Sequence, residues 1–157
     1  GPQRRTLAVA IDTRIKLPEG IGFAKPRVVL PGILAVQGPP HHSESGQIDD
    51  AVQRFCSAYN RNDAINSFPL IVVVDDSDFV ARTLGNFLWT TFTRSNPAAD
   101  VYGIESFMVN KHWGCFGALV IDARAKAHHA PPLVEDPQVS RRVDELAAAG
   151  GPLHGII

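Results

Sequence analysis

Short apolar runs that lack polar alternation predict the strands of a buried sheet. The clearest run covers residues 70–74, where a leucine and an isoleucine precede three valines. β-Branched residues favour strands, and a run without alternation is typical of a central strand of an α/β sheet, which is covered on both faces. Residues 6–11 and 33–36 predict two more strands. Weaker apolar runs predict short strands at residues 28–30, 100–104 and 118–121.

Apolar residues spaced three and four apart predict three helices. The first covers residues 47–60, with Ser45 as its N-cap. The second follows Asp78, which we expect to cap it, and Pro97 prevents its continuation. The third covers residues 136–149 and ends at two glycines. The apolar faces consist of Ile48, Val52, Phe55 and Tyr59, then Val80, Leu84, Phe87, Leu88 and Thr91, and finally Val139, Val143 and Leu146.

Strands that alternate with helices of this length predict an α/β fold. We expect a single layered domain with a mostly parallel or mixed sheet of about five strands flanked by helices. Prolines and glycines interrupt residues 12–27. We therefore expect residues 1–31 to be an N-terminal extension or linker with one strand, and residues 32–157 to form the domain.

Composition excludes several classes of partner. The chain has 157 residues, of which 45% are hydrophobic and 20% charged, and its formal net charge is −1. This charge gives no reason to expect nucleic acid or an anionic membrane surface as a partner. No apolar run approaches the roughly 20 residues that span a bilayer. Two cysteines are too few for a disulfide framework, so we expect a reducing, cytoplasmic location.

The first two residues, Gly1 and Pro2, suggest a fragment or a processed piece, because some proteases that remove tags leave this dipeptide.

An acidic turn follows the strand at 70–74. Its three carboxylates, at Asp75, Asp76 and Asp78, can bind a hard cation, because such metals prefer several converging oxygens. The alternative, which we favour, is a solvated turn in which one aspartate caps a helix. Arg94 follows at the end of that helix, and we expect it to pair with Asp75, Asp76 or Asp100 as a structural pin. The alternative is that Arg94 contacts a substrate.

Residues 106–117 form the least generic segment, which we expect to be a loop. Lys111, His112 and Trp113 place a cation, a titratable ring and an indole side by side. Such a loop can line a pocket for an aromatic acid, with Trp113 stacking and Lys111 or His112 facing a carboxylate or phosphate. The alternative is that Trp113 belongs to the core and Lys111 faces solvent.

Other reactive side chains carry weaker signals. The adjacent histidine pairs at 41–42 and 128–129 have poor spacing for one zinc ion, so we expect surface loops there. Cys115 has no obvious paired base, which makes a free-standing hydrolase the weakest hypothesis.

The motifs together resemble the C-terminal domain of the UbiD family, which comprises prenylated-flavin-dependent decarboxylases and carboxylases. Residues 71–78 are similar to its Val-Val-Asp-Asp-x-Asp segment. Trp89 and a Thr-Arg-x-x-Pro-x-x-Asp exit, which includes Arg94 and Asp100, stand where the family has theirs. Residues 110–115, 121–124, 126 and 128–131 most resemble members that act on phenols or phenylphosphate, as phenylphosphate carboxylase does.

The resemblance implies that catalysis and closure over the substrate belong to different domains or subunits. The catalytic Glu-Arg-Glu set and the prenylated FMN with its divalent metal belong to another domain or subunit, so we expect no catalytic residue and no bound cofactor in this chain alone. Lys111, His112 and Trp113 are the expected substrate-binding residues, in a domain that closes over an aromatic substrate and builds homo- or hetero-oligomer contacts. The expected structural residues are Asp75, Asp76, Trp89, Arg94 and Asp100.

A second hypothesis is that the chain is a non-catalytic assembly or regulatory subunit of a multisubunit carboxylase, because one scaffold can serve several functions.

Overall fold

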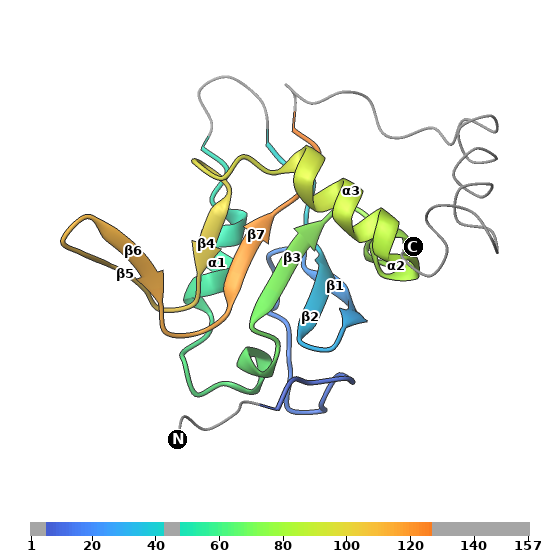
Figure 1. Cartoon of the computed structure of the whole chain (residues 1–157), viewed down its shortest axis with the longest axis horizontal. Coiled ribbons are helices and arrows are strands. Elements are labelled where there is room, and N and C mark those ends of the chain that lie inside the picture. Colours follow the sequence, from blue (N-terminus) through green and yellow to red (C-terminus); the bar gives the residue numbers. More distant parts are fainter. Residues whose placement is uncertain (1–5, 43–47, 127–157) are drawn as a thin grey trace, which may run out of the picture.

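The apolar run at residues 70–74 is the central strand of a five-stranded sheet (Figure 1). The computed structural model describes residues 6–42 and 48–126. The strand order is β1-β2-β3-β7-β4, in which β2, β3 and β7 are parallel and the two edge strands are antiparallel. The strands are β1 (Ala24–Leu30), β2 (Ile33–Gln37), β3 (Leu70–Val74), β4 (Val101–Gly103) and β7 (Leu119–Asp122). The predicted α/β class with a mixed sheet of about five strands is confirmed.

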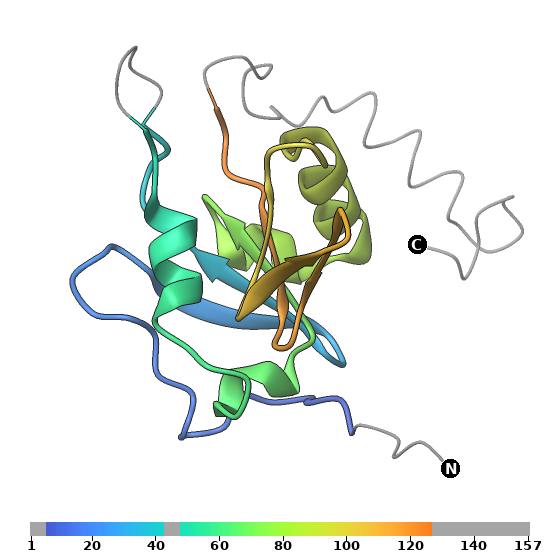
Figure 2. The same ribbon diagram turned by 90° about the vertical axis from the view of Figure 1, so that its left-hand side faces the viewer.

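The unbroken apolar character of β3 has a direct structural reason. Ile71 and Val73 face one apolar cluster, and Val72 and Val74 face another on the opposite side of the sheet. Helix α1 (Ala51–Ser57) and the 3-10 helix η1 (Ala64–Ser67) contribute to the first cluster, and α2 (Ser77–Arg82) and α3 (Leu84–Arg94) to the second. Figures 1 and 2 show α1 and α3 on opposite faces of the sheet. Because both faces of β3 are covered, a strand sequence that alternated apolar and polar residues would bury polar side chains.

The strand predicted at residues 6–11 is wrong. This segment is irregular, and 71% of Val9 is exposed. Two backbone hydrogen bonds hold it, from Ala8 N to the Ser67 carbonyl and from Gly32 N to the Ala8 carbonyl. The edge beside β2 is instead taken by β1, which begins four residues before the predicted strand at 28–30 and reaches β2 through a tight turn at Gly32, with φ +79°. The β1–β2 hairpin, which is local in sequence, therefore occupies this edge, and the more distant run of residues 6–11 does not pair there.

Two of the three helix predictions hold in position but not in extent. Helix α1 is shorter than residues 47–60, and 93% of Ile48 is exposed. The helix after β3 is divided at Thr83, whose extended backbone ends α2 and whose hydroxyl accepts from Asn86 N to cap α3. Asp76 rather than Asp78 caps α2, because its carboxylate accepts from Phe79 N at 3.0 Å. Ser45 and the helix predicted at 136–149 lie outside the described residues.

Residues 106–117 form a β-hairpin instead of the predicted loop. Strands β5 (Ser106–Val109) and β6 (His112–Cys115) pair as a separate two-stranded sheet. Asn110 and Lys111 both have positive φ, of 49° and 65°, as a two-residue type I′ turn requires. The usual sequence signal for this turn is Asn-Gly. This chain lacks that signal, because a lysine takes the second position.

The carboxyl end of the sheet is fixed by a buried ion cluster around Arg124. This side chain is 0% exposed and donates to Asp122 at 2.9 Å, to Asp49 at 2.8 Å and to the Pro39 carbonyl at 2.9 Å. It thereby joins the end of β7 to the loop after β2 and to the start of α1. Burial by itself raises the pKa of Asp49, but hydrogen bonds from Arg124 and from backbone amides outweigh it and hold that pKa at about 2.

Within residues 6–42 and 48–126, no helix has the length and apolar character needed to cross a membrane.

Replacing Arg124 with methionine is expected to lower the free energy of unfolding by about 3–5 kcal/mol, because Asp49 and Asp122 then lose their buried partner. Urea denaturation measures the loss. Arg14→Ala is the control, because the Arg14–Asp12 pair is exposed and its loss is expected to leave stability nearly unchanged. Equal stabilities for Arg124→Met and Arg14→Ala would contradict a stabilising role for the buried cluster.

Two Gly→Ala substitutions are expected to have opposite effects on stability. A Cβ at Gly103 in β4 would lie 2.5 Å from the Cβ of Cys115 in β6, so Gly103→Ala should push the hairpin away and cost about 1–3 kcal/mol. A Cβ at Gly85 in α3 would meet only the Thr83 hydroxyl, at 3.8 Å, so Gly85→Ala should stabilise the chain by about 0.5 kcal/mol. Thermal unfolding of both variants measures the difference, and a stabilising Gly103→Ala would show that the hairpin does not pack on β4.

Candidate functional site

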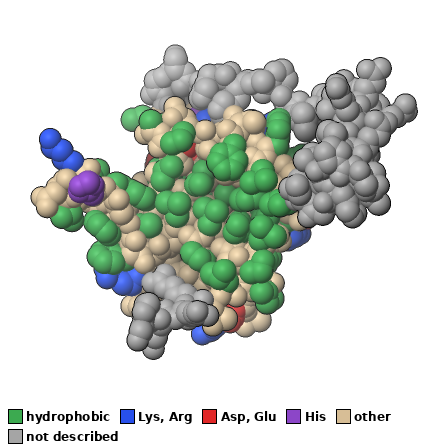
Figure 3. Space-filling view, in the orientation of Figure 1, with side chains coloured by type: hydrophobic (Ala, Val, Ile, Leu, Met, Phe, Trp, Pro, Cys, Tyr) green, Lys and Arg blue, Asp and Glu red, His purple; other side chains and the backbone are tan. Residues whose placement is uncertain are grey.

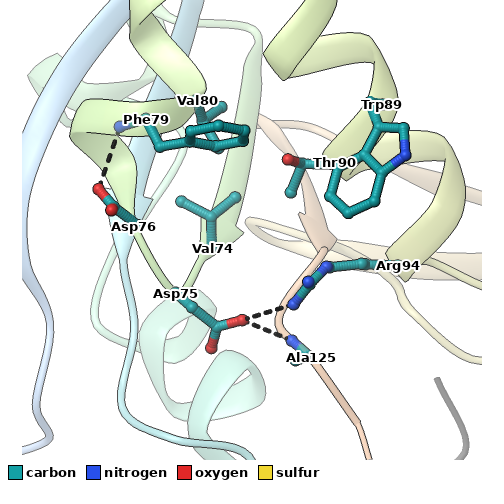
Figure 4. Close-up of a pocket in the computed structure, with 9 residues that line it drawn as sticks. All are labelled: Val74, Asp75, Asp76, Phe79, Val80, Trp89, Thr90, Arg94 and Ala125. Atoms are coloured by element: carbon teal, nitrogen blue, oxygen red, sulfur yellow. Dashed lines mark hydrogen bonds and ion pairs between the residues drawn. The ribbon is translucent and has the colours of Figure 1, made fainter. Parts of the chain in front are cut away.

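A cavity of about 370 Å³ lies at the carboxyl end of β3, between the strand and helices α2 and α3 (Figure 4). This end of a parallel sheet is where α/β proteins commonly bind ligands. Residues from β3, both helices and the segment after β7 line it: Val74, Asp75, Asp76, Phe79, Val80, Trp89, Thr90, Arg94 and Ala125. Four of the five residues predicted to be structural, Asp75, Asp76, Trp89 and Arg94, therefore meet at one cavity.

The walls of the cavity are apolar and partly aromatic. Figure 4 shows the rings of Phe79 and Trp89 on opposite sides, with Val74 and Val80 nearby and the Thr90 side chain between the rings. Thr90 is 5% exposed, and its hydroxyl has no hydrogen-bond partner among the described residues. A buried hydroxyl without a partner is uncommon in folded proteins.

The polar side of the cavity is an ion pair. Arg94 donates from Nη1 to Oδ2 of Asp75 at 3.2 Å, and the backbone N–H of Ala125 donates to the same oxygen at 2.7 Å. The Arg94 guanidinium also lies 5.4 Å from the centre of the Trp89 ring. Asp75 is thus the partner of Arg94 among the three candidates. Asp100 instead accepts from Asn96 N and lies 3.5 Å from Nζ of Lys126.

The acidic turn has separate partners for its three carboxylates. Asp75 pairs with Arg94, Asp76 caps α2, and Asp78 pairs with Arg27 at 2.7 Å. The hydrogen bond from Arg27 lowers the pKa of Asp78. Over the described part of the chain, no group of three or more His, Cys, Asp or Glu side chains could hold a metal ion.

Lys126 fixes the end of α3 to the end of β7 behind the cavity. Its Nζ donates to the carbonyl oxygens of Arg94 at 2.8 Å, Asp122 at 2.9 Å and Arg124 at 3.1 Å. Neither Arg124 nor Lys126 was predicted to be a structural residue. Their signal in the sequence is two cations directly after a buried strand, where the chain leaves the core.

The three predicted substrate-binding residues lie elsewhere, on the β5–β6 hairpin. Lys111 is in its turn, and His112 and Trp113 begin β6. Lys111 and His112 are exposed, and so is 42% of Trp113. The hairpin follows β4 at one edge of the sheet, whereas α2 packs on β1 at the other edge, so the fold separates it from the cavity. Figure 3 shows it projecting from the body, with basic and histidine side chains at its tip.

Polar and aromatic contacts hold the base of the hairpin. Arg61 forms an ion pair with Glu105 at 3.0 Å, and its guanidinium lies 3.7 Å above the centre of the Phe116 ring. The rings of Phe107 and Phe116 are 4.8 Å apart. The projecting tip is therefore attached to the domain through a fixed base.

The two thiols are poor nucleophiles. Burial raises the pKa of Cys115, whose Sγ lies 3.4 Å from the Gly117 carbonyl and 3.8 Å from the Ala118 carbonyl as a donor. Burial, with a smaller contribution from Cys115, raises the pKa of Cys56 to about 12. Both effects favour the thiol over the reactive thiolate and contradict the hydrolase hypothesis. The histidine pair at 128–129 lies outside the described residues.

The described residues do not fit a prenylated FMN and its metal. They provide no metal-holding cluster, and the cavity at β3 has one cationic side chain for a phosphate, Arg94, which already pairs with Asp75.

Sequence reasoning missed Phe79, Val80 and Thr90 as cavity residues. Val80 was assigned to an apolar helix face, which it does supply. Phe79 and Thr90 come together only because the break at Thr83 folds α2 and α3 over the end of β3. No local pattern marks such a break.

Comparison with known proteins relates part of the chain to a decarboxylase. The chain is 31% identical over 81 residues to a 4-hydroxybenzoate decarboxylase subunit of Chlamydia pneumoniae, and the match covers 52% of this chain and 14% of that protein. An uncharacterized protein of Chlamydia muridarum (strain MoPn / Nigg) is 29% identical over 79 residues, or 50% of this chain and 14% of that protein. The chain thus spans about one seventh of the length of these relatives. No family model matches it.

Two solved structures of the vanillic acid decarboxylase of Sedimentibacter hydroxybenzoicus in its open form are also similar. Both have a TM-score of 0.41 and 17% identity, and the matches cover 74% and 73% of this chain and 27% and 26% of those chains. The sequence match to a decarboxylase supports the relationship to UbiD-related enzymes that the motifs indicated.

Proposed function

We propose that this chain is the C-terminal, substrate-closing and oligomerisation part of a UbiD-like decarboxylase or carboxylase acting on a phenol- or phenylphosphate-like substrate. The catalytic Glu-Arg-Glu set and the prenylated FMN with its divalent metal are proposed to lie in a partner domain or subunit. The main support for the proposal is the sequence similarity between half of this chain and one seventh of a decarboxylase protein. That protein has ample further length for the reactive centre.

The pairing of charges at the carboxyl end of the sheet supports this division. Asp75 pairs with Arg94, Asp49 and Asp122 pair with Arg124, and Asp100 lies beside Lys126. Each of these carboxylates contacts a cation of the fold. These groups are suited to fixing the fold rather than to acid–base catalysis.

The hairpin tip is the part of the chain that we propose for the wall of the substrate chamber. Its exposed Lys111 and His112 can face a carboxylate or phosphate, and Trp113 can stack on a ring. A fixed base and a projecting tip suit a group that reaches into a neighbouring domain and excludes water there. Both cysteines are free thiols, which is consistent with the cytoplasmic location that we propose.

A second candidate function is assembly without contact to substrate. The hairpin and its flank expose large apolar side chains, at Phe107, Met108, Val109, Trp113 and Phe116. An exposed apolar group of this kind is typical of a protein interface. The same hairpin could then hold a partner subunit while the substrate lies elsewhere.

Replacing both Lys111 and His112 with alanine in the assembled enzyme is expected to lower kcat/KM for decarboxylation by at least about tenfold, because the substrate anion loses its charged contacts. Steady-state kinetics measures the loss, and size-exclusion chromatography checks that the assembly is intact. Arg54→Ala is the matched control, because it removes an exposed cation from α1 and should leave turnover unchanged.

The outcomes separate the two functions. Unchanged kcat/KM in an intact complex would contradict the substrate wall, and dissociation with normal turnover of the remaining complex would favour assembly. Titrating the isolated chain with prenylated FMN is the second check. Tight stoichiometric binding would contradict the placement of the cofactor in a partner.

A further inference from the structure

We propose that the cavity at the carboxyl end of β3 binds a small neutral aromatic molecule that carries a hydroxyl group, and that it discriminates against aromatic carboxylates. This site is distinct from the hairpin residues of the proposed function, and it stands or falls independently of that function.

The shape and walls of the cavity favour an aromatic ring. Its volume of about 370 Å³ is near the lower end of the range for small-molecule sites and accommodates a single-ring compound. Phe79 and Trp89 lie on opposite sides of it, so a ring that enters can contact both aromatic side chains (Figure 4). Val74 and Val80 complete an apolar lining.

Thr90 provides the polar group that this ligand would use. Two other hydroxyls near the end of α3 bond to carbonyls four residues earlier, Thr93 to Trp89 at 2.6 Å and Ser95 to Thr91 at 2.5 Å. Thr90 makes no such bond within the described part of the chain, although it is only 5% exposed and lies between the two rings. The oxygen itself is inaccessible to solvent, so rotation of the Thr90 side chain would have to turn it toward the ligand. A ligand hydroxyl could then donate to it or accept from it, which would satisfy the buried group.

The charges around the cavity favour a neutral ligand. The cavity is lined by two carboxylates, Asp75 and Asp76, and by one cation, Arg94. That cation already pairs with Asp75. Oδ1 of Asp75 has no partner among the described residues, so it can accept a hydrogen bond from a ligand hydroxyl. A ligand carboxylate has no proton to donate at neutral pH and is repelled by the excess negative charge.

Binding of phenol and of benzoate to the full 157-residue chain at pH 7 tests the proposal. The two compounds have similar size and differ in charge. Calorimetric titration is expected to give one phenol site and at least about tenfold weaker binding of benzoate, because like charges repel across a partly desolvated cavity. Shifts of the backbone amide signals of Phe79 and Ala125 in NMR spectra would locate phenol at the cavity.

Two threonine variants provide a matched pair. Thr90 and Thr91 are both buried, and neither hydroxyl has a partner in the described residues, but only Thr90 lines the cavity. Valine at either position keeps the shape and breaks no internal hydrogen bond. Thr90→Val is expected to weaken phenol binding at least about fivefold, since one hydrogen bond is lost, and Thr91→Val is expected to leave it unchanged.

Asp76→Asn tests the charge selection. Asparagine caps helices as well as aspartate does, so this change removes a negative charge and keeps the cap of α2. The ratio of phenol to benzoate affinity is expected to fall in this variant. Any one of three results would overturn the proposal. The unmodified chain could fail to bind phenol, it could bind benzoate as tightly as phenol, or the two threonine variants could have equal effects.

Discussion

The fold depends on one buried cation. Arg124 is inaccessible to solvent and satisfies two carboxylates and a backbone carbonyl that come from three separate parts of the chain. Burying these charges is unfavourable unless each is paired, so the loop after β2, the start of α1 and the end of β7 must come together as a unit. Lys126 extends the same constraint to the end of α3 through its bond to the Arg94 carbonyl. The carboxyl end of the sheet is thereby held in one arrangement.

This constraint creates the cavity at β3. With the end of α3 fixed, Arg94 lies beside Asp75, and the break at Thr83 separates α2 from α3 at the strand end. The Asp75–Arg94 pair therefore both joins the end of α3 to the end of β3 and lines the cavity.

The molecule separates its two chemically distinctive regions. The hairpin with Lys111, His112 and Trp113 is attached beyond β4, and the cavity lies at the carboxyl end of β3, between that strand and helices α2 and α3. One region presents exposed cationic and aromatic groups to a neighbour, and the other encloses an apolar space with excess negative charge. In the function that we propose, only the first region faces the reaction chamber, which leaves the second for a different ligand.

The sequence by itself determined the sheet and its centre, because an uninterrupted β-branched run such as Leu70–Val74 is stable only between two covered faces. It also indicated the Arg94 pin and the acidic turn, since short-range charge and capping patterns are local. The tertiary structure decided the rest. Strand β1 took the edge of the sheet beside β2, and residues 6–11, which were expected to form a strand, remained outside the sheet. The break at Thr83 brought together the residues of the cavity. A type I′ turn at Asn110 and Lys111 produced a hairpin where a loop was expected. Each of these outcomes depends on contacts between residues distant in sequence or on backbone angles that no periodic pattern encodes.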